Sequence, residues 1–417
     1  MMISAEAFKK AYKEMDTLDF SKAASVLEII KEVREKGDEA IKAFSLKFDK
    51  VEVNELLVPR SELEKAWSEL DEKLKEALEL SKRNIEKYQK SIMWKQMEKS
   101  ELYQKVHALR RVGIYVPGGK ASYPSTVLMT AVLARVAGVE EIIVVTPPQK
   151  DGINRATLAA CYISGVDRVY QTGGAQAVAA LAYGTETIPR VDKIVGPGNQ
   201  YVALAKKLVY GDVGIDSIAG PSEIVIVADH TANKEWVALD ILAQAEHDEM
   251  ARTFLISSDE KVLSSIEEEL KKQKLLQPRL KVIEESLENN HYAILTSGKD
   301  ESIEIVNLIA GEHVSIQTAD AEDYVEKVRT AGAIFIGEYS PEAIGDYSAG
   351  PSHVLPTSGN ARFASGLSVN DFLRTNSVIS LSRETFMECA AAAVAIANEE
   401  SLAAHRDSVS IRMGERA

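Results

Sequence analysis

The residues best suited to chemistry lie in the segment Asp240-Ile-Leu-Ala-Gln-Ala-Glu-His-Asp248, which has the apolar spacing of a helix. It carries Gln244 and His247 three residues apart, so both side chains would share one helix face. An amide oxygen and an imidazole nitrogen that point the same way can form half of a metal site. The sequence therefore predicts that the other half comes from elsewhere in the chain.

Histidine is rare in the sequence as a whole. Only seven occur, and four stand in polar clusters that contain an acid: His247, His313, His353 and His405. Each alone is typical of a solvated or capping side chain, but four such clusters in one chain favour a shared site. Gln244, His247, Asp346 and His405 together offer two nitrogen and two oxygen donors, a set suited to Zn²⁺.

Glu312 and His313 form an adjacent acid–base pair at the start of a predicted strand. Neighbouring strand residues normally face opposite sides of the sheet, so both can serve one site only if the preceding turn rotates one of them. The competing interpretation is a capping glutamate beside a half-buried histidine. The sequence leaves these two interpretations open.

Three glycine-rich turns follow predicted strands: Tyr115-Val-Pro-Gly-Gly119, Gly173-Gly-Ala-Gln176 and Gly196-Pro-Gly-Asn199. Glycine lets a phosphate approach the backbone, and helix N-termini attract anions. Each turn alone could simply be tight, but three at the carboxyl edge of one sheet favour a nucleotide. The chain has neither a Gly-x-Gly-x-x-Gly fingerprint nor a Walker loop, so a dinucleotide would bind in an unusual way.

Composition narrows the class of protein. The 417 residues carry a net charge of −14, which argues against a nucleic-acid partner, and they are enough for two or more domains. Cys161 and Cys389 are the only cysteines, and both stand in apolar, Ala-rich surroundings, which indicates buried, reduced thiols and a cytoplasmic location. We expect neither a signal peptide nor a membrane span.

From residue 111 onward, short apolar strands alternate with helices, the pattern of βαβ units around parallel sheets. The strands are predicted at 112–116, 141–146, 168–171, 193–195, 223–228, 253–256, 292–295, 313–317 and 333–336. The helices are predicted at 22–36, 61–75, 76–93, 125–137, 154–164, 174–183, 199–210, 233–248, 260–272, 300–309, 321–330 and 383–400. Residues 337–368 are rich in Gly, Ser and Pro and are expected to form a long functional loop.

The longest motifs resemble those of the histidinol dehydrogenase family across nearly the whole chain. Besides the three glycine-rich turns they include Ala219-Gly-Pro-Ser-Glu223, Gln244-Ala-Glu-His247, Gly311-Glu-His313, Gly345-Asp-Tyr-Ser-Ala-Gly-Pro-Ser-His353 and Leu367-Ser-Val-Asn-Asp-Phe-Leu373. The resemblance implies two doubly wound, incomplete Rossmann-like α/β domains of the aldehyde dehydrogenase-like kind, with small helical segments at both ends. It implies a division into residues 1–14, 15–114 with 223–367, 115–222, and a tail at 368–417.

The resemblance also implies an activity: oxidation of L-histidinol to L-histidine through histidinaldehyde, the last step of histidine biosynthesis, with two NAD⁺ used per turnover and one Zn²⁺ per subunit. Glu312 and His313 would be the catalytic pair. The family's metal ligands correspond to Gln244, His247, Asp346 and His405, and its NAD contacts to Tyr115, Gln176 and Asn199. Substrate-binding residues would be Ser222, Gln244, His247, His313, Asp346, His353, Glu400 and His405. Family members are homodimers, in which Glu400 and His405 would act in the partner's site.

Three rival functions remain at this stage. A dehydrogenase on the same scaffold could oxidise another amino alcohol or a sulfonated diol, although the Glu400 carboxylate would repel a sulfonate. A metabolite-binding protein without activity is the second, but the catalytic pair and every metal ligand are present. A metallohydrolase is the third, and it would leave the three glycine-rich turns without a role.

Overall fold

The computed structural model describes residues 2–12, 20–118, 123–218 and 220–414. The chain divides into two compact units. The first comprises residues 1–93 and 108–372, and the second comprises residues 94–107 and 373–417. Each unit is described by itself.

The first unit contains two six-stranded sheets. One has the order β1 (Met2–Ser4), β11 (His291–Leu295), β10 (Arg252–Ser257), β9 (Glu223–Ala228), β12 (His313–Gln317) and β13 (Ala333–Ile336), and its strands run parallel. The other has the order β2 (Leu57–Val58), β6 (Arg168–Gln171), β5 (Glu141–Thr146), β4 (Arg111–Tyr115), β7 (Lys193–Val195) and β8 (Gly214–Ile215), and only β2 is antiparallel. We call them the β9 sheet and the β4 sheet.

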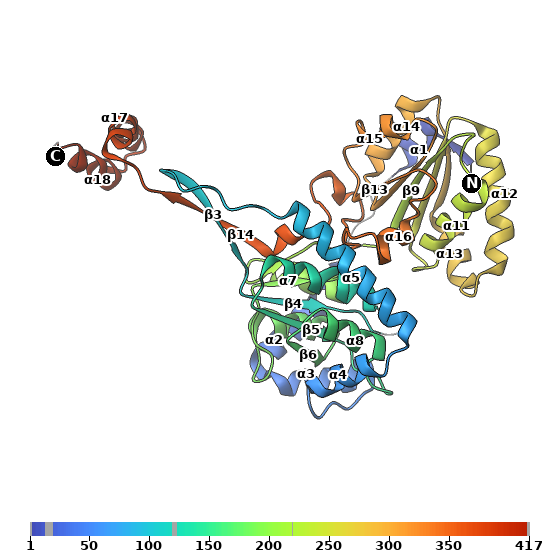
Figure 1. Ribbon diagram of the computed structural model, residues 1–417, viewed down its shortest axis with the longest axis horizontal. Coiled ribbons are helices and arrows are strands. Elements are labelled where there is room, and N and C mark those ends of the chain that lie inside the picture. The colour runs from blue at the N-terminus through green and yellow to red at the C-terminus, as the bar shows by residue number, and fades with distance from the viewer. Residues whose placement is uncertain (1, 13–19, 119–122, 219, 415–417) are drawn as a thin grey trace. The chain divides into compact units, whose positions relative to one another are not determined.

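Helices cover both faces of the β9 sheet (Figure 1). One face packs against α11 (Lys234–Ala245), α12 (Glu260–Gln273) and α13 (Leu280–Asn290), and the other against α1 (Ala5–Ala11), α14 (Lys299–Ile309) and α15 (Ala321–Val325). The strands are apolar along both faces because helices bury both. α16 (Glu342–Tyr347) follows β13.

The β4 sheet buries one face under α2 (Ala23–Lys36), α3 (Asp38–Phe44), α9 (Gly174–Tyr183) and α10 (Gln200–Val209). The π-helical turn η2 (Ser45–Asp49) continues from α3. The remaining helices of this part are α4 (Arg60–Ser68), α5 (Glu72–Ile92), α8 (Arg155–Ile163) and the continuous run of α6 (Pro124–Val127), η3 (Leu128–Val132) and α7 (Leu133–Ala137). Within it α4 packs on α8, and α5 on α7.

The second unit pairs β3 (Leu102–Ala108) with β14 (Leu373–Ile379) and packs α17 (Arg383–Glu399) against α18 (Ala403–Met413) (Figure 1). Among the described residues, no helix has both the length and the apolar character needed to cross a bilayer.

All nine predicted strands are present to within one residue at either end. Several predicted helices differ. Asp71 caps a new helix, so the predicted helix 61–75 is wrong: α4 ends at Ser68 and α5 begins at Glu72. The predicted helix 321–330 stops at Val325, and the loop predicted at 337–368 contains α16. Cys161 is buried as predicted, but the prediction is wrong for Cys389, which is exposed on α17.

Membership of the sheets differs from the predicted division of the chain. β1, within the predicted N-terminal segment 1–14, is the edge strand of the β9 sheet. β2 and β4, assigned to the segment 15–114, belong to the β4 sheet, and the boundary predicted after residue 114 cuts β4 before its last residue. Apolar runs reveal strands in a sequence, but they do not reveal which sheet a strand joins.

Candidate active site

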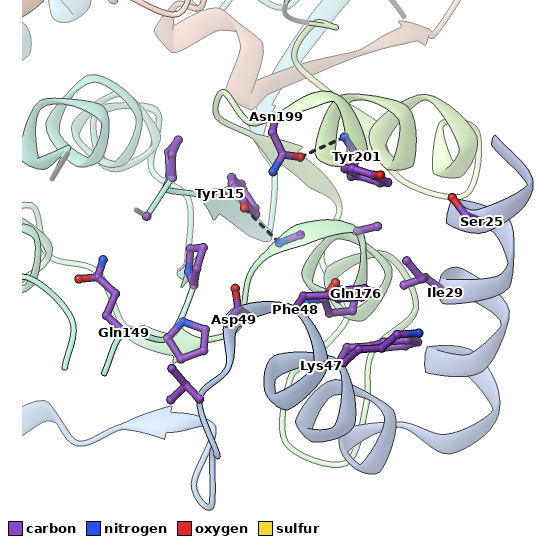
Figure 2. Close-up of a pocket in the computed structure, with 18 of the residues that line it drawn as sticks. Ser25, Ile29, Lys47, Phe48, Asp49, Tyr115, Gln149, Gln176, Asn199 and Tyr201 are labelled. Carbon is purple, nitrogen blue, oxygen red and sulfur yellow. Dashed lines mark hydrogen bonds between the residues drawn. The ribbon is translucent and has the colours of Figure 1, made fainter. Parts of the chain in front are cut away.

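Three residues predicted to contact a dinucleotide, Tyr115, Gln176 and Asn199, line one cavity of about 900 Å³ (Figure 2). The turns that carry them follow β4, β6 and β7, so they lie at the carboxyl edge of the β4 sheet, as predicted. The Tyr115 hydroxyl accepts a hydrogen bond of 3.1 Å from the Gly174 amide at the start of α9. The Asn199 side chain accepts from the amides of Tyr201 and Val202 and so caps α10.

A buried charge pair holds the turn at Gly196. The Lys206 ammonium donates to the Gly196 carbonyl at 3.0 Å, and the Asp216 carboxylate accepts from the Gly196 amide at 2.7 Å. Lys206 and Asp216 also contact each other, and both side chains are about 3% exposed. Gly196 has a φ of +111°, and a Cβ there would lie 2.2 Å from the Tyr115 carbonyl oxygen. Only glycine fits, and the pair fixes both polar groups of its peptide backbone.

The catalytic pair of the prediction lies at the amino edge of the β9 sheet. Glu312 directly precedes β12, and His313 is its first residue. One Glu312 oxygen accepts from the Glu223 amide at 3.0 Å, while His313 Nδ1 lies 3.1 Å from the Glu223 carbonyl. Both side chains therefore reach the backbone of the residue that begins β9, and the turn before β12 brings them to one place.

These contacts fix the proton on His313. Because a carbonyl only accepts, Nδ1 is the protonated nitrogen and donates to Glu223. His313 Nε2 is buried and has no hydrogen-bond partner among the described residues; its nearest carboxylate oxygen, on Asp346, is 3.8 Å away. A buried nitrogen without a partner is the atom that would accept a proton from a bound hydroxyl.

Helix α11 positions Gln244 and His247. Asn233 caps its N-terminus, and Val237, Ile241 and Leu242 are buried in the core beside the sheet. Since the helix runs back along the sheet, its C-terminal end comes to the amino ends of the strands, near His313. The helix ends at Ala245, so Gln244 lies in its last turn and His247 just beyond it.

Glu342, a residue for which the sequence predicts no role, contacts both His313 and Gln244. Its Oε1 lies 3.7 Å from His313 Nδ1. With its nitrogen directed towards this carboxylate, the Gln244 amide donates to both Glu342 oxygens, at 2.9 and 3.1 Å. That orientation leaves the Gln244 oxygen free to bind a cation. Glu342 and Asp346 are four residues apart on α16, so their side chains share one helix face. This spacing is informative only in a helix, and the sequence predicts an irregular loop here.

One oxygen or nitrogen each from His247, Glu342 and Asp346 lies within 4.8 Å of the others, a grouping that could hold a metal ion. Burial raises the pKa of Glu312 to about 7 and that of Glu342 to about 8. Burial lowers the pKa of His313, but the carboxylates of Glu342, Glu312 and Asp346 together raise it to about 10, so Nε2 can accept a proton only when a bound cation offsets these carboxylates. The cluster is therefore short of positive charge, and its imidazole and carboxylate donors suit Zn²⁺.

The other predicted residues are placed as follows. Ser222 directly precedes β9, and its carbonyl accepts from the Arg252 amide at 2.9 Å. His353 belongs to the same cluster, because its Nδ1 lies 3.1 Å from the Asp346 carbonyl. Glu400 ends α17 and His405 lies in α18, so both belong to the second unit.

Comparisons with known proteins agree with this arrangement. A family model described as histidinol dehydrogenase matches residues 13–413. Histidinol dehydrogenases of Staphylococcus epidermidis and Staphylococcus aureus are 53% identical over 413 residues and 52% over 414, and both alignments cover at least 99% of either chain. The crystal structure of histidinol dehydrogenase from Elizabethkingia anophelis matches with a TM-score of 0.93 at 33% identity, over 99% of this chain and 97% of that one.

Fold and site together define an α/β protein whose two mostly parallel sheets carry a nucleotide-sized cavity and a largely buried centre of acids and histidines. The chain belongs to the histidinol dehydrogenase family.

Proposed function

We propose that this protein oxidises L-histidinol to L-histidine in two steps, through histidinaldehyde, with two NAD⁺ as hydride acceptors. The observation that carries the proposal is the pair Glu312 and His313, which are hydrogen-bonded to the backbone of one residue, Glu223, with His313 Nε2 directed towards Asp346. Two groups able to move protons, fixed side by side in a buried site, suit an alcohol oxidation followed by an aldehyde oxidation. The family to which the chain belongs supports the same reaction.

In the first step His313 Nε2 takes the hydroxyl proton while the carbon-bound hydrogen leaves as hydride for NAD⁺. The aldehyde carbon then needs a water, because only the hydrate has a hydride left to give. Glu312 takes a proton from that water, and His313 takes the next as the second hydride leaves. Histidinol, two NAD⁺ and one water thus give the histidine carboxylate, two NADH and three protons. No cysteine is required.

We further propose that Gln244, His247, Asp346 and, from a second copy of the chain, His405 would hold Zn²⁺. A bound zinc ion would supply positive charge that orients the imidazole and amine of histidinol. Ser222, His353 and the second copy's Glu400 would complete substrate binding, and a carboxylate at position 400 suits the substrate's ammonium group. Tyr115, Gln176 and Asn199 would contact NAD⁺.

The test is the yield of NADH per L-histidinol consumed, before and after chelation. The proposal predicts two NADH per substrate, loss of activity with the chelator and recovery with Zn²⁺. Glu312→Gln should stop the reaction after the first NADH and release aldehyde. Glu246→Gln, a neighbour of His247 outside the proposed ligands, is the matched control. If zinc-loaded, folded protein forms no NADH from L-histidinol, the proposed substrate is wrong.

A further inference from the structure

The cavity at the β4 sheet has a wall that the three glycine-rich turns do not provide. It comes from η2, the π-helical turn that continues α3, and its last residues are Phe48 and Asp49. Single π-helical turns are rare and frequently lie at functional sites. Neither residue belongs to the motifs predicted to contact the dinucleotide.

Asp49 presents an acceptor without a donor. Its Oδ2 is shielded from solvent and has no hydrogen-bond partner among the residues that the structure describes. Burial raises the pKa of this carboxyl to about 6. A buried carboxylate oxygen left unpaired is costly, so donors from a ligand in the cavity would be favourable there.

The neighbours of Asp49 indicate which part of a dinucleotide would meet it. The Phe48 ring stacks on Phe44, with centroids 5.5 Å apart, yet Phe48 remains 49% exposed, so its ring is accessible to a base. The N-terminus of α9, with Gly174 beside the Tyr115 hydroxyl, suits a phosphate. Figure 2 shows Asp49 next to Phe48 and below Tyr115. A ribose lies between base and phosphate, and Asp49 lines the same cavity as the groups suited to those two.

We infer that Asp49 accepts hydrogen bonds from the hydroxyl groups of the adenosine ribose and thereby selects NAD⁺ over its 2′-phosphorylated form. Acidic side chains do this in other dinucleotide-binding α/β folds, and a phosphate on the 2′ oxygen would meet a carboxylate. Among the residues that the structure describes, the basic side chains that line the cavity are Lys47 and Lys150. Lys47 lies over the Phe48 ring, at 5.2 Å from its centroid. The inference rests on the proposed function, because it assumes that the cavity holds NAD⁺.

The experiment measures binding rather than turnover. NADH is titrated into the protein and its binding is followed by NADH fluorescence. AMP, 2′-deoxy-AMP and 3′-deoxy-AMP are then added as competitors. The wild-type protein should bind AMP roughly tenfold or more tightly than at least one deoxy analogue, since a hydrogen bond to a charged group is lost. Asp49→Asn should weaken NADH binding by a similar factor, abolish the preference for AMP and narrow the gap between NADH and NADPH.

Glu35→Gln is the matched control. It removes the same charge from the exposed side of α2, outside the cavity, and should change NADH affinity less than about twofold. The inference is overturned if the wild-type protein binds AMP and both deoxy analogues equally, a result that needs no variant. It is also overturned if folded Asp49→Asn retains the wild-type preference. If the wild-type protein binds no NADH at all, the proposed function fails as well, so the two failures are distinguishable.

Discussion

The buried pair that holds Gly196 gives the sharpest prediction. Replacing Lys206 by Met keeps most of the length of the side chain but leaves the Asp216 carboxylate without its cation, in a place where about 3% of either side chain is exposed. The substitution also removes the donor to the Gly196 carbonyl. The turn that carries Asn199 would lose one of its two anchors.

Removing one partner of a buried ion pair costs about 3–5 kcal/mol of unfolding free energy, because the remaining charge stays desolvated. At about 1.4 kcal/mol per factor of ten, this corresponds to roughly two to three and a half powers of ten in the unfolding equilibrium. Asp216→Asn should cost a similar amount by leaving Lys206 uncompensated. The double variant Lys206→Met with Asp216→Asn buries no charge and should be more stable than either single one.

Urea unfolding measures these differences. Trp67 on α4 reports on the part of the chain around the β4 sheet, so the series is best made with Trp94 and Trp236 replaced by Phe. NADH affinity, measured on the folded variants, should fall together with stability because both depend on the Gly196 turn. A Lys206→Met protein within about 1 kcal/mol of the parent, or a double variant less stable than both single ones, would refute the reasoning.

Three further predictions follow from other contacts. Glu342→Gln should weaken zinc binding by about 10–100-fold, as measured by competition with a chelator, because Glu342 orients the Gln244 amide; unchanged affinity would contradict this. Gly196→Ala should lower both NADH affinity and the urea midpoint, since its Cβ would meet the Tyr115 carbonyl at 2.2 Å, whereas the exposed Gly414→Ala, with no atom within 4 Å, isolates the loss of glycine freedom. Burial raises the pKa of Glu267, but the hydrogen bond with His291 at 2.6 Å outweighs it and holds the pKa below its usual value. The stability from this contact is present above the ordinary glutamate pKa and lost as the pH falls through the folded-state value, so Glu267→Gln should flatten the urea midpoint between about pH 5 and 3; an unchanged slope would count against it.

The sequence predicted the strands well because each is a short apolar run between turn residues, a local signal. It also placed Tyr115, Gln176 and Asn199 at one sheet edge, since consecutive parallel strands present their carboxyl ends together. It could not predict that the acid–histidine centre lies at the opposite, amino edge of the other sheet. That depends on α11 carrying Gln244 back along the strands to their beginnings.

Two site residues escaped prediction for different reasons. Glu342 lies in a Gly- and Pro-rich stretch that has the composition of a loop, and the four-residue spacing to Asp346 has meaning only once α16 is known. Asp49 follows a helix without any Gly or Pro to mark a turn, so the π-helical turn that directs it into the cavity has no sequence signature. A motif identifies a residue by its type and its position in the sequence. The roles of Glu342 and Asp49 depend on what their side chains contact in the folded chain.

Glu312 and His313 are both hydrogen-bonded to the backbone of Glu223, and this limits how the centre can vary. The pairing register of β9 and β12, where His313 lies opposite Ile224, brings both side chains within reach of Glu223. A rotamer change of either side chain would break its hydrogen bond to Glu223, and a one-residue slip between the strands would detach both groups at once. The main chain therefore positions the acid and the base. We expect substitutions of neighbouring side chains to change the shape of the substrate pocket more readily than the spacing of Glu312 and His313.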